Sequence, residues 1–244
     1  GAWVRPKSGK YFRTVNPATE KQIASVAQAN KKDVDLAVQA AQKAQPAWRK
    51  LSGDDRARYL FRIARILQER AREFAVLETL DNGKPIKETR DVDVPLAAQH
   101  FFYHAGWADK LDLLFPGEDP EPVGVVGQII PWNFPLLMAA WKIAPALAAG
   151  NTVVIKPAET SPLTALRLCG VFEQAELPPG VVNVVTGDGA TGAALVRHPD
   201  LNKVAFTGST DVGKEIQRAV AGRSVDLTLE LGGKAAHLVF EDAA

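Results

Sequence analysis

The sequence contains almost no cysteine and no long apolar run. Cys169 is the only cysteine among the 244 residues, so an internal disulfide bond is excluded and a reducing compartment is permitted. No uninterrupted apolar stretch is long enough for a membrane-spanning helix. Residues 1–6 lack the apolar core of a signal peptide. We therefore expect a cytoplasmic protein that does not bind a membrane.

The chain also lacks an excess of charge of either sign. It has 29 Lys and Arg against 28 Asp and Glu, and it has no dense basic run. Because nucleic-acid binding depends on a basic patch, we expect no nucleic-acid partner. His100 and His104 are spaced to share a metal on a predicted helix, but no third ligand accompanies them. No metal site is therefore expected.

The first half of the chain has the patterns of two short extended segments followed by helices. Residues 11–29 are expected to be extended around a turn at Asn16. Apolar residues at helical spacing predict three helices, over residues 31–45, 53–82 and 92–109. Residues 1–121 are thus predicted to form a helical amino-terminal part with short extended segments.

From Pro122 onward, short apolar strands alternate with helical segments. The predicted strands cover residues 123–130, 152–155, 181–185, 203–206, 226–229 and 237–240. Such alternation is typical of βαβ units that build a parallel sheet. The predicted fold is α/β, with a doubly wound, mostly parallel Rossmann-like sheet over residues 122–244.

Polar residues follow four of these strands. Asn133 carries an amide that can donate to a developing oxyanion. Lys156 and Glu159 can bond ribose hydroxyls, and the glycine-bounded turn at residues 207–213 opens a helix whose free N–H groups suit a phosphate. Glu230 can act as a general base. Since ligands bind beyond the carboxyl ends of parallel strands, these residues are expected to share one site.

Each of these residues also has a purely structural interpretation. Asn133 can satisfy its own turn, and Lys156 and Glu159 can form a surface ion pair. Gly208 and Gly213 can be ordinary turn and packing glycines, because their spacing is not that of a dinucleotide fingerprint. A strand-end acid such as that at position 230 can simply be solvated. Their joint placement at one sheet edge favours a site.

Six segments resemble the amino-terminal, NAD(P)-binding domain of the aldehyde dehydrogenase superfamily. They are Asn16-Pro17-Ala18-Thr19, Asp81-Asn82-Gly83-Lys84-Pro85, Pro131-Trp132-Asn133-Phe134-Pro135, Lys156-Pro157-Ala158-Glu159, Phe206-Thr207-Gly208-Ser209-Thr210 and Glu230-Leu231-Gly232-Gly233-Lys234. They occur in the family's order and span nearly the whole chain. The resemblance therefore makes residues 1–244 one NAD-binding domain.

The resemblance implies NAD-dependent oxidation of an aldehyde to a carboxylic acid through a cysteine thioester. It makes Asn133 an oxyanion donor and Glu230 the general base. The cofactor-binding residues that it implies are Ile129, Pro131, Trp132, Lys156, Ala158, Glu159, Gly189, Phe206, Thr207, Gly208, Ser209, Val212, Gly213, Leu231 and Gly232. Because the carboxylate of Glu159 would repel a 2′-phosphate, NAD is expected rather than NADP.

The chain is expected to lack the nucleophile. In the family the catalytic cysteine follows the general base at a distance that falls beyond Ala244, and Cys169 lies in an apolar run typical of an inert core thiol. The partners implied are an aldehyde, the missing catalytic domain of the same protein, and further copies in a homodimer or tetramer. Only residues 111–120 stand where relatives carry a longer assembly hairpin. The isolated chain is predicted to be inactive.

Two alternatives stay open. The chain could be a non-catalytic NAD-binding pseudoenzyme, or a structural, crystallin-like domain of the same superfamily. The presence of both Asn133 and Glu230 favours the enzyme, because neither cofactor binding nor packing requires the two together.

Overall fold

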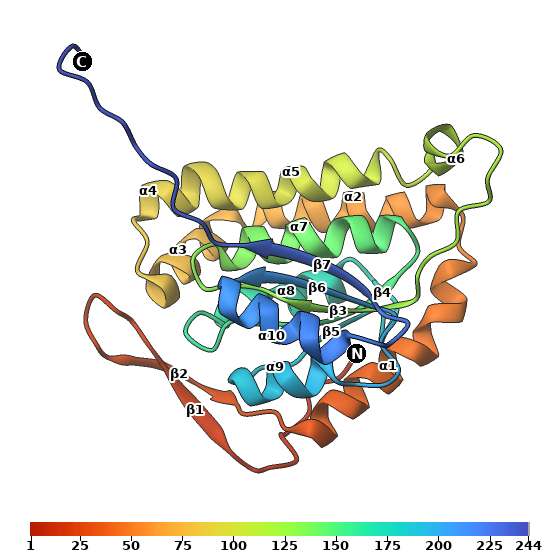
Figure 1. Ribbon diagram of the computed structural model, residues 1–244, viewed down its shortest axis with the longest axis horizontal. Helices are drawn as coiled ribbons and strands as arrows, with labels where there is room; N and C mark the ends of the chain where they lie inside the picture. Colours follow the sequence, from red (N-terminus) through yellow and green to blue (C-terminus); the bar gives the residue numbers. More distant parts are fainter. Residues whose placement is uncertain (244) are drawn as a thin grey trace.

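A five-stranded parallel sheet forms the centre of the computed structural model, which describes residues 1–243 (Figure 1). Its strands are β3 (Val125–Ile129), β4 (Thr152–Lys156), β5 (Val182–Val184), β6 (Lys203–Gly208) and β7 (Asp226–Leu231). Their order is β5-β4-β3-β6-β7, and every neighbouring pair is parallel. The chain builds outward from β3 to β5 and then returns to the other side of β3. This reversal confirms the predicted doubly wound α/β fold.

Helices cover both faces of the sheet (Figure 1). Those that follow the strands are α7 (Pro135–Ala148), α8 (Leu163–Gln174), α9 (Gly189–Val196) and α10 (Thr210–Val220). The alternation of side chains along β4 divides the interior into two cores. Val153 and Ile155 pack with α7 and α8, whereas Val154 packs with α9 and α10. This double burial explains why the strand sequences are continuously apolar.

The amino-terminal part is mostly helical, as predicted. Its elements are β1 (Tyr11–Val15), β2 (Gln22–Ala27), α1 (Lys31–Arg49), α2 (Gly53–Glu69), α3 (Ala71–Asn82), α4 (Ile86–Glu88), the π-helix η1 (Thr89–Asp93), α5 (Val94–Ala105) and α6 (Leu111–Leu114). Helices α2, α3 and α5 pack over α7 and α8, while α1 contributes to the opposite core. Residues 1–121 therefore extend both layers rather than forming a separate body.

Local signals placed several helix ends correctly. Asn30 caps α1 by accepting from the N–H groups of Lys32 and Asp33, and Ser52 caps α2. Gly83 follows α3 with a left-handed φ of 85°, as expected of a C-cap glycine.

The predicted stop of the first helix was wrong. Helix α1 runs through Pro46 to Arg49, which brings the side chain of Trp48 into the core at 1% exposure. A proline inside a helix removes one hydrogen bond, and burial of a tryptophan offsets that loss.

The second predicted helix is two helices. Helix α2 ends at Glu69, Arg70 leaves the helical region, and α3 starts at Ala71. Leu67 and Phe74 are fully buried on either side of the break. Because they keep the same spacing that a continuous helix would give, the apolar pattern did not reveal the break. The third helix differs at its start, where η1 replaces residues 92 and 93 of the expected α-helix.

The strand predicted at residues 237–240 is absent from the described chain. After β7 the backbone leaves the sheet, as the extended blue segment of Figure 1 shows. Leu238, Val239 and Phe240 are between 69% and 77% exposed. A strand needs a hydrogen-bonding neighbour, and no other strand of residues 1–243 lies beside this segment. The sheet thus has five strands rather than about six. No helix of the described residues has the length and apolar character needed to cross a membrane.

Candidate functional site

A cavity of about 920 Å³ lies at the carboxyl ends of the parallel strands. Its walls come from the ends of β3, β4, β6 and β7 and the segments that follow them, together with residues along α7, α9 and α10. All residues of the predicted site except Gly213 line it. The structure therefore brings together groups from positions 129 to 232, as expected for the switch point of a doubly wound sheet.

The loop between β3 and α7 presents Asn133 to the cavity. Pro131 and Pro135 stand on either side of it, and Pro135 is the first residue of α7. The Asn133 side chain is exposed, and no hydrogen-bond partner for its amide occurs within residues 1–243. Its amide is therefore free to donate to a ligand, in contrast to a turn residue that satisfies its own backbone.

Lys156 and Glu159 form an ion pair, but it is not a surface pair. Nζ of Lys156 donates to Oε2 of Glu159 across 3.1 Å, and the lysine side chain is only 6% exposed whereas that of the glutamate is 48% exposed. A buried ammonium beside a half-exposed carboxylate offers a donor and an acceptor on one wall of the cavity. This combination suits a vicinal diol such as that of a ribose.

The turn between β6 and α10 brings backbone N–H groups to the cavity. Ser209 is the N-cap of α10, and its hydroxyl accepts from the N–H of Val212. A Cβ on Gly208 would lie 2.5 Å from the Phe206 ring, so only glycine fits this position. The remaining free N–H groups of the first turn and the helix dipole together favour an anion.

Gly213 has a packing role in the structure. A Cβ there would lie 2.5 Å from a methyl group of Leu231, which itself lines the cavity. The glycine therefore lets Leu231 pack against α10, and it does not face the cavity as the resemblance had implied.

Glu230 and Lys142 bring two charges to the cavity wall. Glu230 is exposed at the end of β7, and both residues line the cavity. Burial lowers the pKa of Lys142 to about 8, and the charge of Glu230 partly opposes that decrease. The two side chains therefore attract each other across the cavity wall.

Sequence reasoning missed several residues of the cavity wall. These are Ile130, Met138, Trp141, Lys142, Ala193, Val196, Arg197, Glu215, Ile216 and Ala219. Most of them lie on α7, α9 or α10, one or two turns beyond residues that were predicted. Val212 and Glu215 are three residues apart on α10, and such spacing places both on one helix face. This periodicity is the signal that could have found them.

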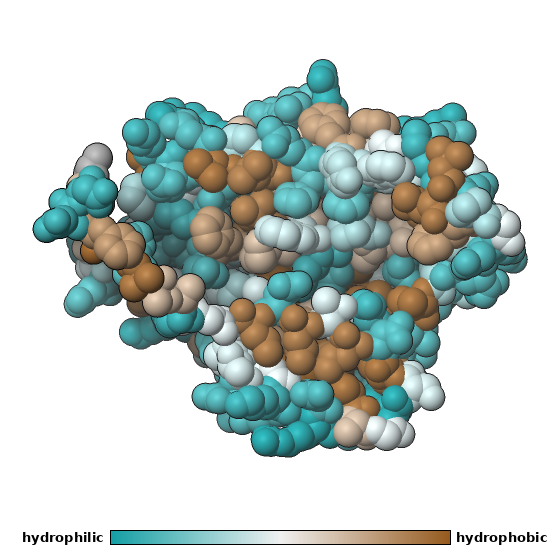
Figure 2. All heavy atoms as spheres, turned by 45° about the horizontal axis from the view of Figure 1, so that its top comes forward, coloured by the Kyte–Doolittle hydropathy of each residue, from teal (hydrophilic) through white to brown (hydrophobic). Residues whose placement is uncertain are grey.

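Apolar side chains remain exposed beside the cavity. Trp132 is 62% and Trp141 54% exposed, and Phe134, two residues after Trp132, is 36% exposed. Figure 2, turned so that the α5 side of Figure 1 comes forward, shows exposed apolar residues in several separate patches on that side of the molecule. Exposed aromatic side chains at a cavity rim favour contact with a ligand or another protein segment.

The cysteine and the histidines lie outside the cavity wall. Cys169 is half-buried on α8 rather than fully buried, and burial raises the pKa of its thiol to about 11. It therefore remains a protonated, unreactive thiol at neutral pH, as predicted. The rings of His100 and His104 stack 6.1 Å apart, and the described residues contain no group of three side chains suited to a metal. His237 lies in the extended tail, where a strand had been predicted.

Comparison with known proteins gives a consistent match over almost the whole chain. A sequence model described as the aldehyde dehydrogenase family matches residues 3–244. Aldehyde dehydrogenase family 2 member B4, mitochondrial, of Arabidopsis thaliana is 49% identical over 100% of this chain and 47% of its own length. Human retinal dehydrogenase 2 is 48% identical over 99% of this chain and 49% of its own length.

Solved structures agree with these matches. The NAD⁺ complex structure of an aldehyde dehydrogenase from Bacillus cereus is 44% identical, with a TM-score of 0.93 over 100% of this chain and 52% of that chain. The chain thus spans about half the length of the relatives that it matches.

Proposed function

Because the chain belongs to the aldehyde dehydrogenase family, we propose that the protein oxidises an aldehyde to a carboxylic acid with NAD through a cysteine thioester. In this proposal the chain supplies the cofactor cradle, an oxyanion donor and the general base. The observation that carries it is that Asn133 and Glu230 line the same cavity as the N-terminus of α10. A binding or packing role would not need both an amide donor and a carboxylate in the wall of one dinucleotide-sized cavity.

The residues present fit a dinucleotide. The cavity of about 920 Å³ is within the range of cofactor sites. Gly208 permits the close approach of a pyrophosphate to the first turn of α10, where Ser209 is the N-cap. When bound there, NAD supplies the hydride acceptor of the reaction. The chemistry of the donors therefore agrees with the family.

Lys156 and Glu159 would bind the hydroxyls of the adenosine ribose. The carboxylate of Glu159 can accept from both hydroxyls of a vicinal diol, and it would repel a phosphate at the 2′ position. The pair supports NAD over NADP as the cofactor, and this preference is part of the proposal.

Asn133 and Glu230, which line the same cavity, would act on the substrate. The amide of Asn133 donates to the oxygen that gains negative charge when the carbonyl carbon is attacked. Glu230 accepts a proton from the water that hydrolyses the thioester, which is general-base catalysis. Lys142 lies beside this carboxylate and supplies the positive charge that attracts it.

The cysteine nucleophile would come from a catalytic domain outside the chain printed here. The exposed apolar side chains beside the cavity, among them Trp132 and Trp141, are the surface that such a domain would cover. This arrangement makes the isolated chain inactive as a dehydrogenase, and formation of NADH by the purified chain would contradict it. Assembly into a dimer or tetramer also remains a proposal.

Glu230→Gln in the full-length protein tests the proposed function. The amide cannot take a proton from water, so we expect steady-state turnover to fall about 10²-fold or more while NAD binding stays within about twofold. Pre-steady-state NADH formation should persist as a burst, because the base acts after hydride transfer. Asp226→Asn, at the exposed opposite end of β7, is the matched control. Near-normal turnover of Glu230→Gln would refute the assignment, and NAD binding without turnover in the unaltered protein would favour the pseudoenzyme.

A further inference from the structure

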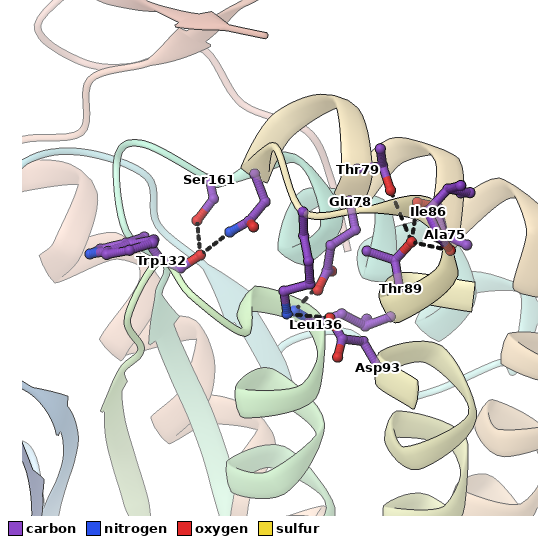
Figure 3. Close-up of polar contacts among 11 residues, drawn as sticks. Ala75, Glu78, Thr79, Ile86, Thr89, Asp93, Trp132, Leu136 and Ser161 are labelled. Atoms are coloured by element: carbon purple, nitrogen blue, oxygen red, sulfur yellow. Dashed lines mark hydrogen bonds and ion pairs between the residues drawn. The ribbon is translucent and has the colours of Figure 1, made fainter. Parts of the chain in front are cut away.

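The loop that carries Asn133, residues 132–136, is surrounded by residues of α3, η1 and the turn before α8 (Figure 3). The carbonyl oxygen of Trp132 accepts two hydrogen bonds, one from Nδ2 of Asn82 and one from the hydroxyl of Ser161 at 3.1 Å. Trp132 immediately precedes Asn133. Its peptide is therefore fixed from two separate segments of the chain.

Phe134, on the other side of Asn133, is held by a lysine. Nζ of Lys84 lies 3.6 Å from the centre of the Phe134 ring, a close cation–π contact. The same ammonium donates to Oδ2 of Asp93 at 2.5 Å, and the two side chains are only 13% and 1% exposed. A largely buried ion pair therefore fixes the cation beneath the ring.

Leu136 is held by a buried acid. Oε2 of Glu78 accepts from the backbone N–H of Leu136 at 3.2 Å, and Glu78 is fully buried. Phe134 stands at the N-cap position of α7 but offers no capping hydrogen bond of its own. Glu78 thus caps this helix from α3, and its carboxyl group lies at the positive end of the helix dipole.

Every second residue of the loop is bound by a residue of α3 or of the turn after it. Asn82 binds residue 132, Lys84 binds residue 134 and Glu78 binds residue 136. The side chain of Asn133 has no partner in the described part of the chain and lines the cavity. Fixing both neighbours of one residue restricts the direction of its side chain. Such restriction is what an oxyanion donor needs, because displacement by about 1 Å can reduce a rate by about 10²-fold.

The buried acids are poorly suited to a purely structural role. Oε1 of Glu78 and Oδ1 of Asp93 have no hydrogen-bond partner within residues 1–243. Burial and the nearby charge of Asp93 raise the pKa of Glu78 to about 8, whereas Lys84, the Leu136 N–H and the buried Thr164 hydroxyl partly oppose that increase. Incompletely satisfied buried polar groups destabilise a fold, and they persist where they serve a site.

We propose that Glu78 is a positioning residue, which together with Asp93 and Lys84 holds the loop at residues 132–136 so that Asn133 points into the cavity. Asn82 supports the same loop from the exposed end of α3. This inference rests on the proposed function, because it assigns a catalytic purpose to the position of Asn133. It adds residues that lie outside the cavity wall.

The test uses Glu78→Ala and Glu78→Gln in the full-length protein. The alanine variant leaves the N–H of Leu136 without a partner, so we expect kcat to fall about 10- to 10²-fold with the KM for NAD within about twofold. The glutamine variant keeps an oxygen acceptor and can donate its amide to Asp93, so it should recover most of kcat. In the alanine variant, amide hydrogen exchange at residues 132–138 should also increase.

Two further variants separate positioning from stability. Thr89→Val removes the Thr89 hydroxyl, which hydrogen-bonds the hydroxyl of Thr79 and donates to the carbonyl of Ala75 or Ile86, and none of these groups reaches the loop. It should lower the melting temperature while kcat stays unchanged. Asn82→Ala removes a partly exposed contact, so the core stays intact while kcat falls. Asn82→Ala therefore tests the inference even if Glu78→Ala does not fold.

Equal exchange at residues 132–138 in the unaltered protein and in the Glu78 and Asn82 variants would overturn the inference. Unchanged kcat in both Asn82→Ala and Glu78→Ala would also overturn it. So would a loss of kcat in Thr89→Val as large as the losses in those two variants. If the unaltered protein fails to oxidise aldehydes, the proposed function fails instead. The exchange comparison then still decides whether Glu78 orders the loop.

Discussion

Replacement of Lys142 by methionine should stabilise the protein at neutral pH. Lys142 is largely buried in the cavity wall, and burial lowers its pKa from 10.5 to about 8 in the folded protein. At about 1.4 kcal/mol per pH unit, this difference makes the charged lysine cost about 3 kcal/mol in folding free energy. Methionine has a similar length and no charge, so Lys142→Met should recover roughly 2 to 3 kcal/mol.

The sign of the pH dependence follows from the two pKa values. Below pH 8 both the folded and the unfolded states hold the proton on Lys142, so the cost is fully present. Between pH 8 and 10.5 the unfolded state holds more protons, and stability therefore rises with pH. Above 10.5 the cost is gone. The advantage of the methionine variant should accordingly disappear across this window.

Urea unfolding at pH 7 and pH 10, followed by tryptophan fluorescence, measures both effects. Lys214→Met, on the exposed side of α10, is the control for replacing a lysine by methionine at the surface, and its stability should change by less than about 0.5 kcal/mol. If Lys142→Met is no more stable than the unaltered protein at pH 7, or keeps its advantage at pH 10, the reasoning from burial is wrong.

Three substitutions and one chemical modification test the cavity and the cysteine. Gly208→Ala would place a Cβ 2.5 Å from the Phe206 ring, so NAD affinity measured by calorimetry should fall about tenfold; Gly170→Ala, outside the cavity wall, whose Cβ would meet its nearest atom at 3.7 Å, should bind normally. Glu159→Gln removes the charge that repels a 2′-phosphate, so the ratio of kcat/KM for NAD over NADP should fall about tenfold, and an unchanged ratio would contradict that role. Burial raises the pKa of the Cys169 thiol to about 11, so iodoacetamide at pH 7 should leave it unmodified.

Most of the helices and strands could be predicted because each is marked by a local pattern of apolar residues. The strands from β3 to β7 are short apolar runs between helices, and periodicity alone located them to within a few residues. The break at Arg70 and the π-helix before α5 could not be predicted. In both places the apolar residues before and after the irregularity keep the spacing of a continuous helix. The false strand at residues 237–240 has the composition of a strand, but composition cannot supply a neighbouring strand.

The residues that follow the strands were predictable because their positions depend on sheet topology. Asn133, Lys156 and Glu230 each follow a parallel strand, and such strand ends converge on one edge. Lys142 and Glu78 could not be assigned in this way. They lie on helices whose apolar pattern indicates core packing, and only the packing of α7 against the sheet and of α3 against α8 and α5 brings their side chains to the site.

The sequence by itself thus determined the family, most of the strands and helices along the chain and many of the residues that line the cavity, because these depend on local periodicity and on motifs. Only the tertiary structure decided which residues hold the loop that carries Asn133. Glu78 and Lys84 are some fifty to sixty positions away from the loop in the sequence, yet they contact it through a hydrogen bond and a cation–π contact, and Asp93 pairs with Lys84. Contacts between distant segments arise from the packing of whole helices, and no local pattern of residue types encodes them.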